Sequence, residues 1–364
     1  MRRSLLALCL PVLLHARNHV RVEVEDEAMG TTFSLTLYGE SRAALNAAAA
    51  AAFAELHRLD GMLSNYRPES EWSEVNRSAA LRPVRVSPEL FHLLAECLRY
   101  SRESGGAFDI TVGPLMKIWG FYKGEGLLPR NTEIGAALHL VGYTHVQLDA
   151  ASQTVKFDQP GVELDPGGIG KGYAVDCMAA VLKAHGVGSA LVSAGGSSIY
   201  AIGAPPDTPE GWTIRIRAPD DPHRTAAEVA LKDMSLSTSG GYEKFFIAEG
   251  RTYSHIMDPR TGYPAQGTSA VSVLAPRTID SEVWAKPYFI LGRSWAAAHR
   301  PKDFKIFICD DAGRHTCAWI TTATAASRTP VARETKSGPS AATRSTASAR
   351  SLRSGTSRCA VPCP

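Results

Sequence analysis

Hydrophobic residues recur at two different spacings in the first third of the chain. Residues 31–38, "TTFSLTLY", alternate between apolar and polar positions, which is the period of a half-buried strand. Residues 42–59 are rich in alanine and carry their larger apolar residues at helical spacing. Residues 87–103 are amphipathic, and Ser87-Pro88 supplies the start signal that helices favour. The pattern therefore predicts one strand and two helices before residue 104.

Further along the chain, the same spacings predict more strands than helices. We first expect a strand-turn-strand pair near Val146–Phe157 and then a glycine turn that opens a helix ending at Gly186. Two strands should follow around the glycines of "SALVSAGGSSIYAIG", and then paired strands in "WTIRIRA" and "EVALKDMSLSTS". The last expected elements are a helix over 280–291 and two strands within 303–320. Such patterns locate elements but do not fix the topology of a sheet.

The two ends of the chain differ in composition from the part between them. Residues 1–16, "MRRSLLALCLPVLLHA", place two arginines before a short apolar run, which is typical of a secretory signal and too short to span a bilayer. Residues 321–364 are rich in Ser, Thr, Ala and Arg, and they lack the apolar surface that would offset the entropy of ordering them. We therefore predict a signal peptide at 1–16, one folded domain at 17–320 and a disordered basic tail at 321–364.

Composition and charge narrow the function classes. The 364 residues are 44% hydrophobic and 21% charged, which is enough apolar content for a sizeable core. The formal net charge is +3, but the tail alone holds seven basic residues against one acid, Glu334, so the rest of the chain is mildly acidic. A mildly acidic body argues against a nucleic-acid partner. The seven cysteines show no CxxC spacing, so the sequence predicts no zinc site and no legible disulfide framework.

The segment Tyr253–Pro264, "YSHIMDPRTGYP", places a histidine three residues before an aspartate that leads into a turn. Because proline cannot extend a central strand and Thr-Gly favours a turn, we expect a strand at Thr252–Ile256 with His255 near its end, facing the loop. Loops of this kind carry much of the chemistry of α/β proteins. On this segment alone, an incidental histidine beside a turn is the alternative.

A second candidate is the glycine-rich segment at residues 163–176, "ELDPGGIGKGYAVD". It is not a P-loop, because Gly172 stands where a Ser or Thr would follow the lysine, and its glycine spacing differs from the dinucleotide-binding fingerprint. A glycine turn at a helix N-terminus still presents backbone N–H groups to an anion, and Lys171 adds a positive charge. The alternative is a tight strand-to-helix turn with a surface lysine.

Three further segments complete a pattern: "AMGTTFSL" at 28–35, "GMLSNYRPESEWSEVN" at 61–76 and "SGGAFDITVGPLMKIWGF" at 104–121. Together with the two segments above, and in this order, they resemble the motifs of the FAD:protein FMN transferase family, also called ApbE or thiamine-biosynthesis lipoprotein, over about residues 25–292. The resemblance implies an α+β, T-fold-type structure with a mixed, largely antiparallel sheet, packed helices and FAD in a central cleft. It also favours a functional His255 over an incidental one.

The resemblance further implies a transferase that cleaves FAD, attaches FMN through a phosphoester to a threonine of an acceptor protein and releases AMP, with Mg²⁺ assisting. Residues expected to contact FAD are Met29, Tyr66, Ala107, Phe108, Asp109, Lys171, Cys177, Ile256 and Ala285, with Asp109 bonded to the adenine or ribose. His255 would be the general base for the acceptor hydroxyl, and Asp258 would orient it or help to hold the metal.

The expected metal site departs from the family pattern. Ahead of "FILG" the family has an aspartate and, four residues later, a threonine as magnesium ligands, whereas this chain has Glu282 and Lys286. The Ala174 carbonyl is the other expected ligand, and Asp280 would face elsewhere on a helix. Glutamate offers a hard oxygen to Mg²⁺, but a protonated lysine cannot ligate and brings its own charge. Two interpretations stay open: an altered metal site, or an ordinary i, i+4 surface pair.

The function hypotheses follow from these alternatives. The first is the flavin transferase, the second an FAD pyrophosphatase giving FMN and AMP, and the third a non-catalytic FAD-binding protein with a degenerate metal site. The expected partners are FAD and a threonine-bearing acceptor protein, with peripheral membrane association. A working signal implies a periplasmic location or attachment to the outer face of the inner membrane; without it the protein is cytoplasmic.

Overall fold

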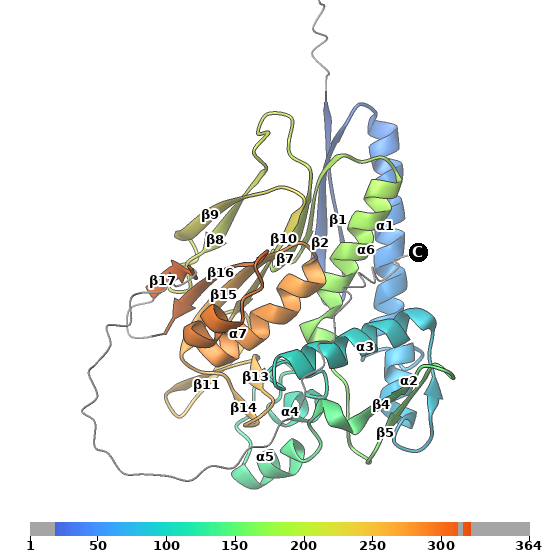
Figure 1. The fold of residues 1–364 in the computed structure, drawn as a ribbon, viewed down its shortest axis with the longest axis vertical. Coiled ribbons are helices and arrows are strands. Elements are labelled where there is room, and N and C mark those ends of the chain that lie inside the picture. The colour runs from blue at the N-terminus through green and yellow to red at the C-terminus, as the bar shows by residue number, and fades with distance from the viewer. Residues whose placement is uncertain (1–18, 312–315, 322–364) are drawn as a thin grey trace, which may run out of the picture. The chain divides into compact units, whose positions relative to one another are not determined.

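An eight-stranded antiparallel sheet forms the centre of the fold (Figure 1). The computed structural model describes residues 19–311 and 316–321, so the predicted signal peptide and nearly all of the predicted tail lie outside the described residues. Neighbouring strands follow the order β1-β2-β6-β7-β10-β15-β16-β17, and each neighbouring pair is antiparallel. Their bounds are β1 Val20–Ala28, β2 Thr31–Gly39, β6 Ser189–Ala194, β7 Ser198–Ile202, β10 Met234–Gly240, β15 Thr268–Ala275, β16 Lys305–Asp310 and β17 Thr316–Trp319. The predicted largely antiparallel sheet is confirmed.

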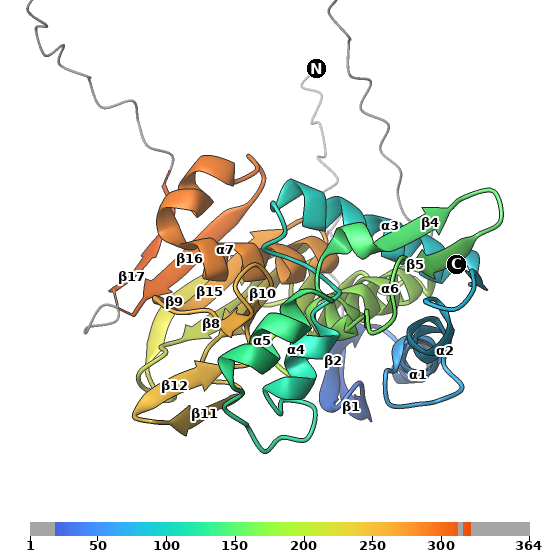
Figure 2. The same ribbon diagram turned by 90° about the horizontal axis from the view of Figure 1, so that it is seen from below.

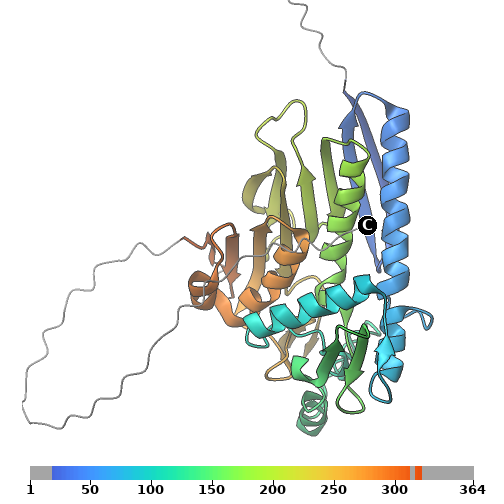
Figure 3. The ribbon, with the colours of Figure 1, turned by 45° about the vertical axis from the view of Figure 1, so that its right-hand side comes forward.

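Three helices, α1 (Arg42–Leu63), α6 (Gly170–Ala184) and α7 (Thr278–His299), cover one face of the sheet (Figure 3). Helix α1 packs on β1, β2 and α6, and α7 packs on β10 and β15. The period of two along β10 explains the contact with α7. Its Ser235 and Ser237 hydroxyls lie 2.9 and 2.8 Å from the Ser281 hydroxyl of α7, whereas the apolar Leu236 points to the opposite face.

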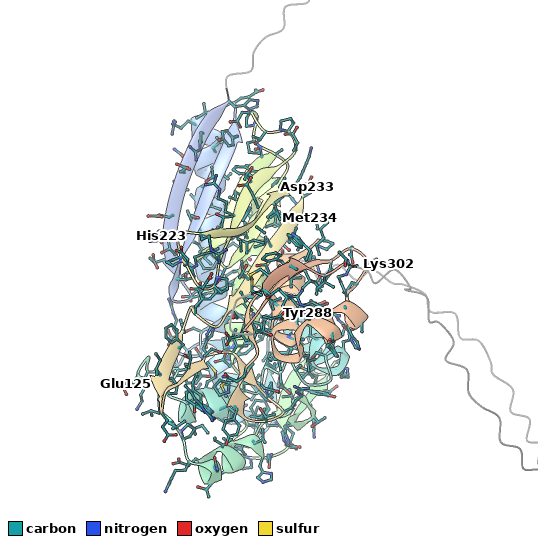
Figure 4. The ribbon with its side chains drawn as sticks, turned by 90° about the vertical axis from the view of Figure 1, so that its left-hand side faces the viewer. Glu125, His223, Asp233, Met234, Tyr288 and Lys302 are labelled. Atoms are coloured by element: carbon teal, nitrogen blue, oxygen red, sulfur yellow. A yellow bond between two sulfur atoms is a disulfide. The ribbon has the colours of Figure 1, made fainter. Side chains whose placement is uncertain are left out.

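On that opposite face lies a hairpin of β8 (Trp212–Arg217) and β9 (Thr225–Leu231), whose apolar residues share a core with Leu236. The predicted pairing of "WTIRIRA" with "EVALKDMSLSTS" is confirmed for the first part of the second stretch, because β8 pairs with β9. That stretch nevertheless forms two strands, β9 and β10, where one was expected. Figure 4 shows Asp233 and Met234 side by side where the chain enters β10. Asp233 adopts the left-handed φ of 52°, and its carboxylate accepts a 2.9 Å hydrogen bond from the Gly203 N–H, so the chain turns there instead of continuing straight.

The remaining elements gather at one end of the sheet (Figure 2). They comprise α2 Glu71–Ser78, α3 Pro88–Glu103, α4 Gly113–Ile118 and α5 Asn131–Leu138, the short sheet of β3 Val84–Arg85, β5 Thr154–Phe157 and β4 Val146–Asp149, the hairpins β11 Phe245–Ala248 with β12 Arg251–Ser254 and β13 Met257–Asp258 with β14 Tyr263–Pro264, and the 3₁₀ turns Tyr143–His145 and Pro166–Gly168. The Trp119 indole donates a 2.9 Å hydrogen bond to the Gly262 carbonyl, which ties α4 to the β13–β14 turn. The segments before β6 are thereby joined to the segment that follows His255.

Helices α3 and α7 begin for different physical reasons. Ser87 caps α3 as predicted, because its hydroxyl accepts the Leu90 N–H at 3.3 Å and a proline follows it. Helix α7 is interrupted at Gly292, whose φ of 76° is not helical, so its first segment ends where the predicted helix 280–291 ends and begins two residues earlier; its N-cap residue, Arg277, makes no capping hydrogen bond. The carboxylate of Asp176, on α6, accepts the N–H groups of Thr278 and Ile279 at 2.7 and 2.9 Å. A residue 102 positions earlier thus fixes where α7 starts.

A disulfide joins Cys309 of β16 to Cys317 of β17, which face each other in the strand register. The spacing of the cysteines along the sequence did not predict this bond, because the pairing depends on which strands are neighbours. Among the described helices, none has the length and apolar character needed to cross a membrane.

Candidate active site

A cavity of about 760 Å³ opens at the end of the sheet where the β1–β2 turn, the β6–β7 turn and the end of β10 come together. All five sequence segments that carry the resemblance contribute to its wall. The lining residues are Glu27–Thr31, Asp60, Leu63–Arg67, Ala107–Ile110, Val112, Met116, Phe121, Tyr122, Asp165–Gly168, Gly170, Lys171, Gly195, Ser197, Ser198, Ser237–Gly240, Glu243, Lys244, His255–Met257, Pro259, Glu282, Lys286 and Ile290. Segments spread over more than 260 positions therefore form one site.

Most of the residues predicted to contact FAD lie on this wall. They are Met29, Tyr66, Ala107, Phe108, Asp109, Lys171 and Ile256, joined by His255 and Glu282. Ala174, Cys177 and Ala285 are fully buried inside α6 and α7 and are not among the residues that line the cavity. Their predicted contacts with FAD or metal stay predictions, because these three residues pack between the helices and not on the wall itself.

The β1–β2 turn presents Met29 to the cavity in a strained conformation. Met29 and Gly30 have φ of 52° and 70°, so both central residues of this two-residue turn are left-handed. A non-glycine residue there needs support, and the Met29 N–H donates a 3.0 Å hydrogen bond to the Asp60 carboxylate, which also holds Arg67 at 2.8 Å. The sulfur of Met29 approaches the place of a Cβ on Gly170 to 4.0 Å. The Met-Gly pair thus lies directly against the glycine turn.

The glycine turn at the start of α6 is shaped by close approach and by its N–H groups. A Cβ on Gly172 would stand 2.7 Å from both the Glu282 carboxylate and the Thr278 carbonyl, so no larger residue fits there without moving α7. The Gly172 N–H donates to the Glu282 carboxylate. Lys171 is not a free surface lysine, because its Nζ donates a 2.7 Å hydrogen bond to the Ser197 hydroxyl at the cavity wall. The anion-binding interpretation of this turn stays a prediction, since its lysine and its Gly172 N–H already have partners within the protein.

Sequence reasoning missed a buried acid on this wall. Asp165 accepts hydrogen bonds from the Tyr122 hydroxyl at 2.6 Å and from the Gly167 N–H at 2.7 Å, and its burial raises its pKa. Asp165 is the first residue of the Asp-Pro-Gly-Gly segment and could have been singled out there, but Tyr122 carries no local signal. Asp109 also lies on the wall, and its carboxylate accepts from the Thr111 N–H and hydroxyl and from the Tyr143 N–H. Its expected hydrogen bond to the adenine or ribose stays a prediction.

His255 follows directly after β12 and is half-buried at the cavity wall, as the strand-end prediction required. Its Nδ1 lies 3.1 Å from the Lys244 carbonyl oxygen. A carbonyl can only accept, so Nδ1 carries the proton and Nε2 is left as the basic nitrogen. Burial lowers the pKa of His255 to about 4, with Lys244, Lys286 and Lys171 adding to the effect, so the imidazole is neutral at physiological pH.

Asp258 does not orient this histidine. Its carboxylate is buried and accepts from the N–H, Nε and Nη2 of Arg260 at 3.0, 2.8 and 2.8 Å. The orienting role predicted for Asp258 is therefore performed by the Lys244 carbonyl, and Asp258 shapes the turn after His255. The β11–β12 pairing brings Lys244 beside His255, which the spacing along the sequence alone does not show.

The comparisons with known proteins agree with this geometry. The model of the ApbE family matches residues 29–307. The FAD:protein FMN transferase of Treponema pallidum (strain Nichols) is 34% identical over 294 residues, covering 76% of this chain and 79% of the relative. That of Klebsiella pneumoniae (strain 342) is 32% identical over 268 residues, covering 72% and 80%. This chain belongs to the ApbE family.

Solved ApbE structures share the fold as well as the sequence. The ApbE protein from Thermotoga maritima superposes with a TM-score of 0.75 at 28% identity, covering 82% of this chain and 96% of that one. The apo form of the flavinyl transferase ApbE from Pseudomonas stutzeri gives a TM-score of 0.74 at 30% identity, covering 84% and 96%. The predicted family, fold and enzyme class, a flavin transferase, are confirmed.

The Mg²⁺ expected of an ApbE protein does not fit the oxygens offered here. The Nζ of Lys286 donates to the carbonyl oxygens of Glu282 and Gly168 at 2.9 and 3.1 Å and lies 3.7 Å from the Glu282 carboxylate. Burial lowers the pKa of Lys286 to about 8 against the attraction of Glu282, so the ammonium form still prevails at pH 7. Glu282 is 3% exposed and Lys286 lines the cavity, so the interpretation as an ordinary surface pair was wrong.

Three other acidic residues in this ApbE chain already pair with arginines. Asp280 faces away from the cavity as predicted, and it pairs with Arg277 at 2.8 Å and with the Tyr100 hydroxyl. Glu55, Glu89 and Cys177 place ligand atoms within 4.8 Å of one another outside the cavity. Arg58 makes two hydrogen bonds to each of those carboxylates, so its guanidinium is the cation of that cluster.

Proposed function

We propose that this protein cleaves the pyrophosphate of FAD in the cavity, attaches FMN through a phosphoester to a threonine hydroxyl of an acceptor protein, and releases AMP. The proposal rests mainly on the protonation state and position of His255. A neutral imidazole with a free Nε2 at the cavity wall is suited to accept the proton of an attacking hydroxyl. The relatives are named FAD:protein FMN transferase, which supports FAD as the substrate.

The chain's own groups provide the rest of the chemistry. The acceptor oxygen forms a bond to the phosphorus of FMN, the bridging P–O bond to AMP breaks, and the hydroxyl proton passes to Nε2 of His255. Lys171, Lys244 and the N-terminal end of α6 face the cavity and compensate the charge of the diphosphate. Phosphoryl transfer of this kind depends mainly on positioning and charge neutralisation, and both are provided by this wall.

The test is incubation of the purified protein with FAD and a threonine-bearing acceptor, with the acceptor's Thr→Ala variant as control. Flavin fluorescence that stays on the denatured acceptor, together with AMP in equal amount, supports transfer. AMP and free FMN without labelled acceptor indicate a pyrophosphatase. Bound FAD that is never cleaved indicates a flavin carrier.

We also propose that the protein is exported. The basic and apolar start of the sequence supports a signal peptide, and the Cys309–Cys317 bond supports an oxidising compartment, since structural disulfides are rare in the cytosol. Alkylation before and after reduction, on protein taken from its native cell, tests this. Export requires Cys309 and Cys317 to react only after reduction, whereas labelling without reduction would contradict it.

A further inference from the structure

We propose that the ammonium of Lys286 is the resident cation of the cavity and takes the place of a divalent metal ion in compensating the diphosphate of FAD. The inference deepens the proposed FAD cleavage and rests on it. It predicts an ApbE protein whose binding of FAD does not depend on Mg²⁺.

The first argument is that the oxygens a metal would need are already bound. Lys286 Nζ contacts the carbonyl oxygens of Glu282 and Gly168 at 2.9 and 3.1 Å, and the Glu282 carboxylate at 3.7 Å. The two carbonyl oxygens accept hydrogen bonds from the ammonium, and the carboxylate at 3.7 Å forms an ion pair with it. Mg²⁺ requires near-octahedral oxygen coordination and does not share its ligands with a bound ammonium. A divalent ion entering here would displace the lysine or lie beside a like charge.

The second argument is that the lysine is held in place. Its side chain is 21% exposed, and it stands on α7, whose first turn is fixed by Asp176. Glu282, one turn earlier, is 3% exposed and accepts from the Gly172 N–H, so the carboxylate cannot swing away to another partner. These contacts hold the ammonium between α7 and the glycine turn.

The third argument is where that position lies. Gly168, whose carbonyl holds Nζ, belongs to the glycine turn that precedes α6, and both Gly168 and Lys286 line the cavity. Gly170 and Lys171, the first two residues of α6, line the same cavity. Positive groups from two elements thus converge where a diphosphate would be bound. Part of the charge that a divalent metal would bring to such a site is here covalently part of α7.

The test measures FAD binding by quenching of flavin fluorescence, with MgCl₂ or with EDTA, on the full chain. The wild type should bind FAD equally well in both. Lys286→Met keeps the length of the side chain without its charge, and we expect FAD affinity to fall by about 10- to 100-fold, the range of a hydrogen bond to a charged group. Lys183→Met is the matched control, because Lys183 also bonds a neighbouring side chain, Tyr200, but lies outside the cavity. It should bind FAD like the wild type.

A second variant tests the exchange of cations directly. Lys286→Thr removes the ammonium and adds a hydroxyl oxygen beside Glu282, so its FAD affinity should be low in EDTA and recover with MgCl₂. Calorimetric titration of MgCl₂ into each FAD-bound protein should then show binding to Lys286→Thr and none to the wild type. Thermal melting of every variant separates loss of folding from loss of binding, and the wild-type titrations decide the matter even if a variant fails to fold.

Two failures can be told apart. If the wild type binds and cleaves FAD only when MgCl₂ is present, Lys286 is not the cation, although the proposed function stands. If the wild type binds FAD in EDTA but never releases AMP in any condition, the proposed cleavage fails while the binding role of Lys286 is kept.

Discussion

The Nδ1 atom of His255 lies 3.1 Å from the backbone carbonyl oxygen of Lys244, so the main chain sets the tautomer of this histidine. In many active sites a carboxylate takes this position and stabilises the protonated imidazole. The carbonyl fixes the ring, and its own effect is to raise the pKa of His255. Burial, together with the charges of Lys244, Lys286 and Lys171, outweighs that effect and keeps the imidazole unprotonated.

Replacing His255 by alanine should lower the rate of FMN transfer by about two to four orders of magnitude, because the general base is lost. FAD affinity should change little, since His255 lies at the wall and carries no charge. Transfer rate and FAD quenching are measured on the same preparation. His185→Ala is the control, as its Nδ1 also contacts a backbone carbonyl, that of Val181, but outside the cavity. Equal rates for the two variants would remove His255 from the mechanism.

The titration of His255 makes a second prediction. Its folded pKa of about 4 lies below the usual 6.5, so between these values the unfolded chain binds more protons than the folded one. The free energy of unfolding of the wild type should therefore decrease as the pH falls from 6.5 toward 4. Over the same pH range, the free energy of unfolding of the His255→Ala protein should decrease less. Histidine-labelled NMR gives the pKa directly. A His255 resonance that titrates near 6.5 in the free protein contradicts the prediction.

Removal of the Asp176 carboxylate should destabilise the start of α7. Asp176→Ala leaves the N–H groups of Thr278 and Ile279 without their acceptor, and loss of a helix cap costs about 1–2 kcal/mol. Urea unfolding of the variant measures this cost. Asp176→Asn keeps one acceptor oxygen and should recover part of the stability. If both variants match the wild type, α7 is fixed by its packing on β10 and β15 alone.

A methyl group at Gly172 should damage both stability and FAD binding. Its Cβ would meet the Glu282 carboxylate and the Thr278 carbonyl at 2.7 Å, which forces α7 outward, and overpacking of this kind costs about 1–3 kcal/mol. Gly135→Ala in α5 is the control, because its Cβ has no neighbour within 4 Å and alanine favours helix there. Melting temperature and FAD quenching should fall for Gly172→Ala alone. An unperturbed Gly172→Ala protein would mean that α7 yields easily at this point.

The sequence alone determined the features that depend on short-range chemistry. The Met29-Gly30 turn, the glycine turn before α6, the capped start of α3 and the position of His255 after a strand follow from backbone preferences within a few residues. Such preferences depend on residues that are close in sequence, so they can be recognised without knowing the tertiary structure. The order of the motifs indicated the family, and the family resemblance predicted that these local segments line one cavity.

The tertiary structure decided which groups meet across the chain. Lys244 rather than Asp258 holds His255, Asp176 caps a helix 102 residues away, and Cys309 pairs with Cys317 because β16 and β17 are neighbours. Along the sequence, Glu282 and Lys286 show only a spacing of four, which suits a surface pair as well as a buried one. Packing of α7 on the sheet turned that face toward the glycine turn, and burial between these elements made Lys286 a fixed cation of the cavity. Contacts of this kind depend on how whole elements pack, and no local pattern records that.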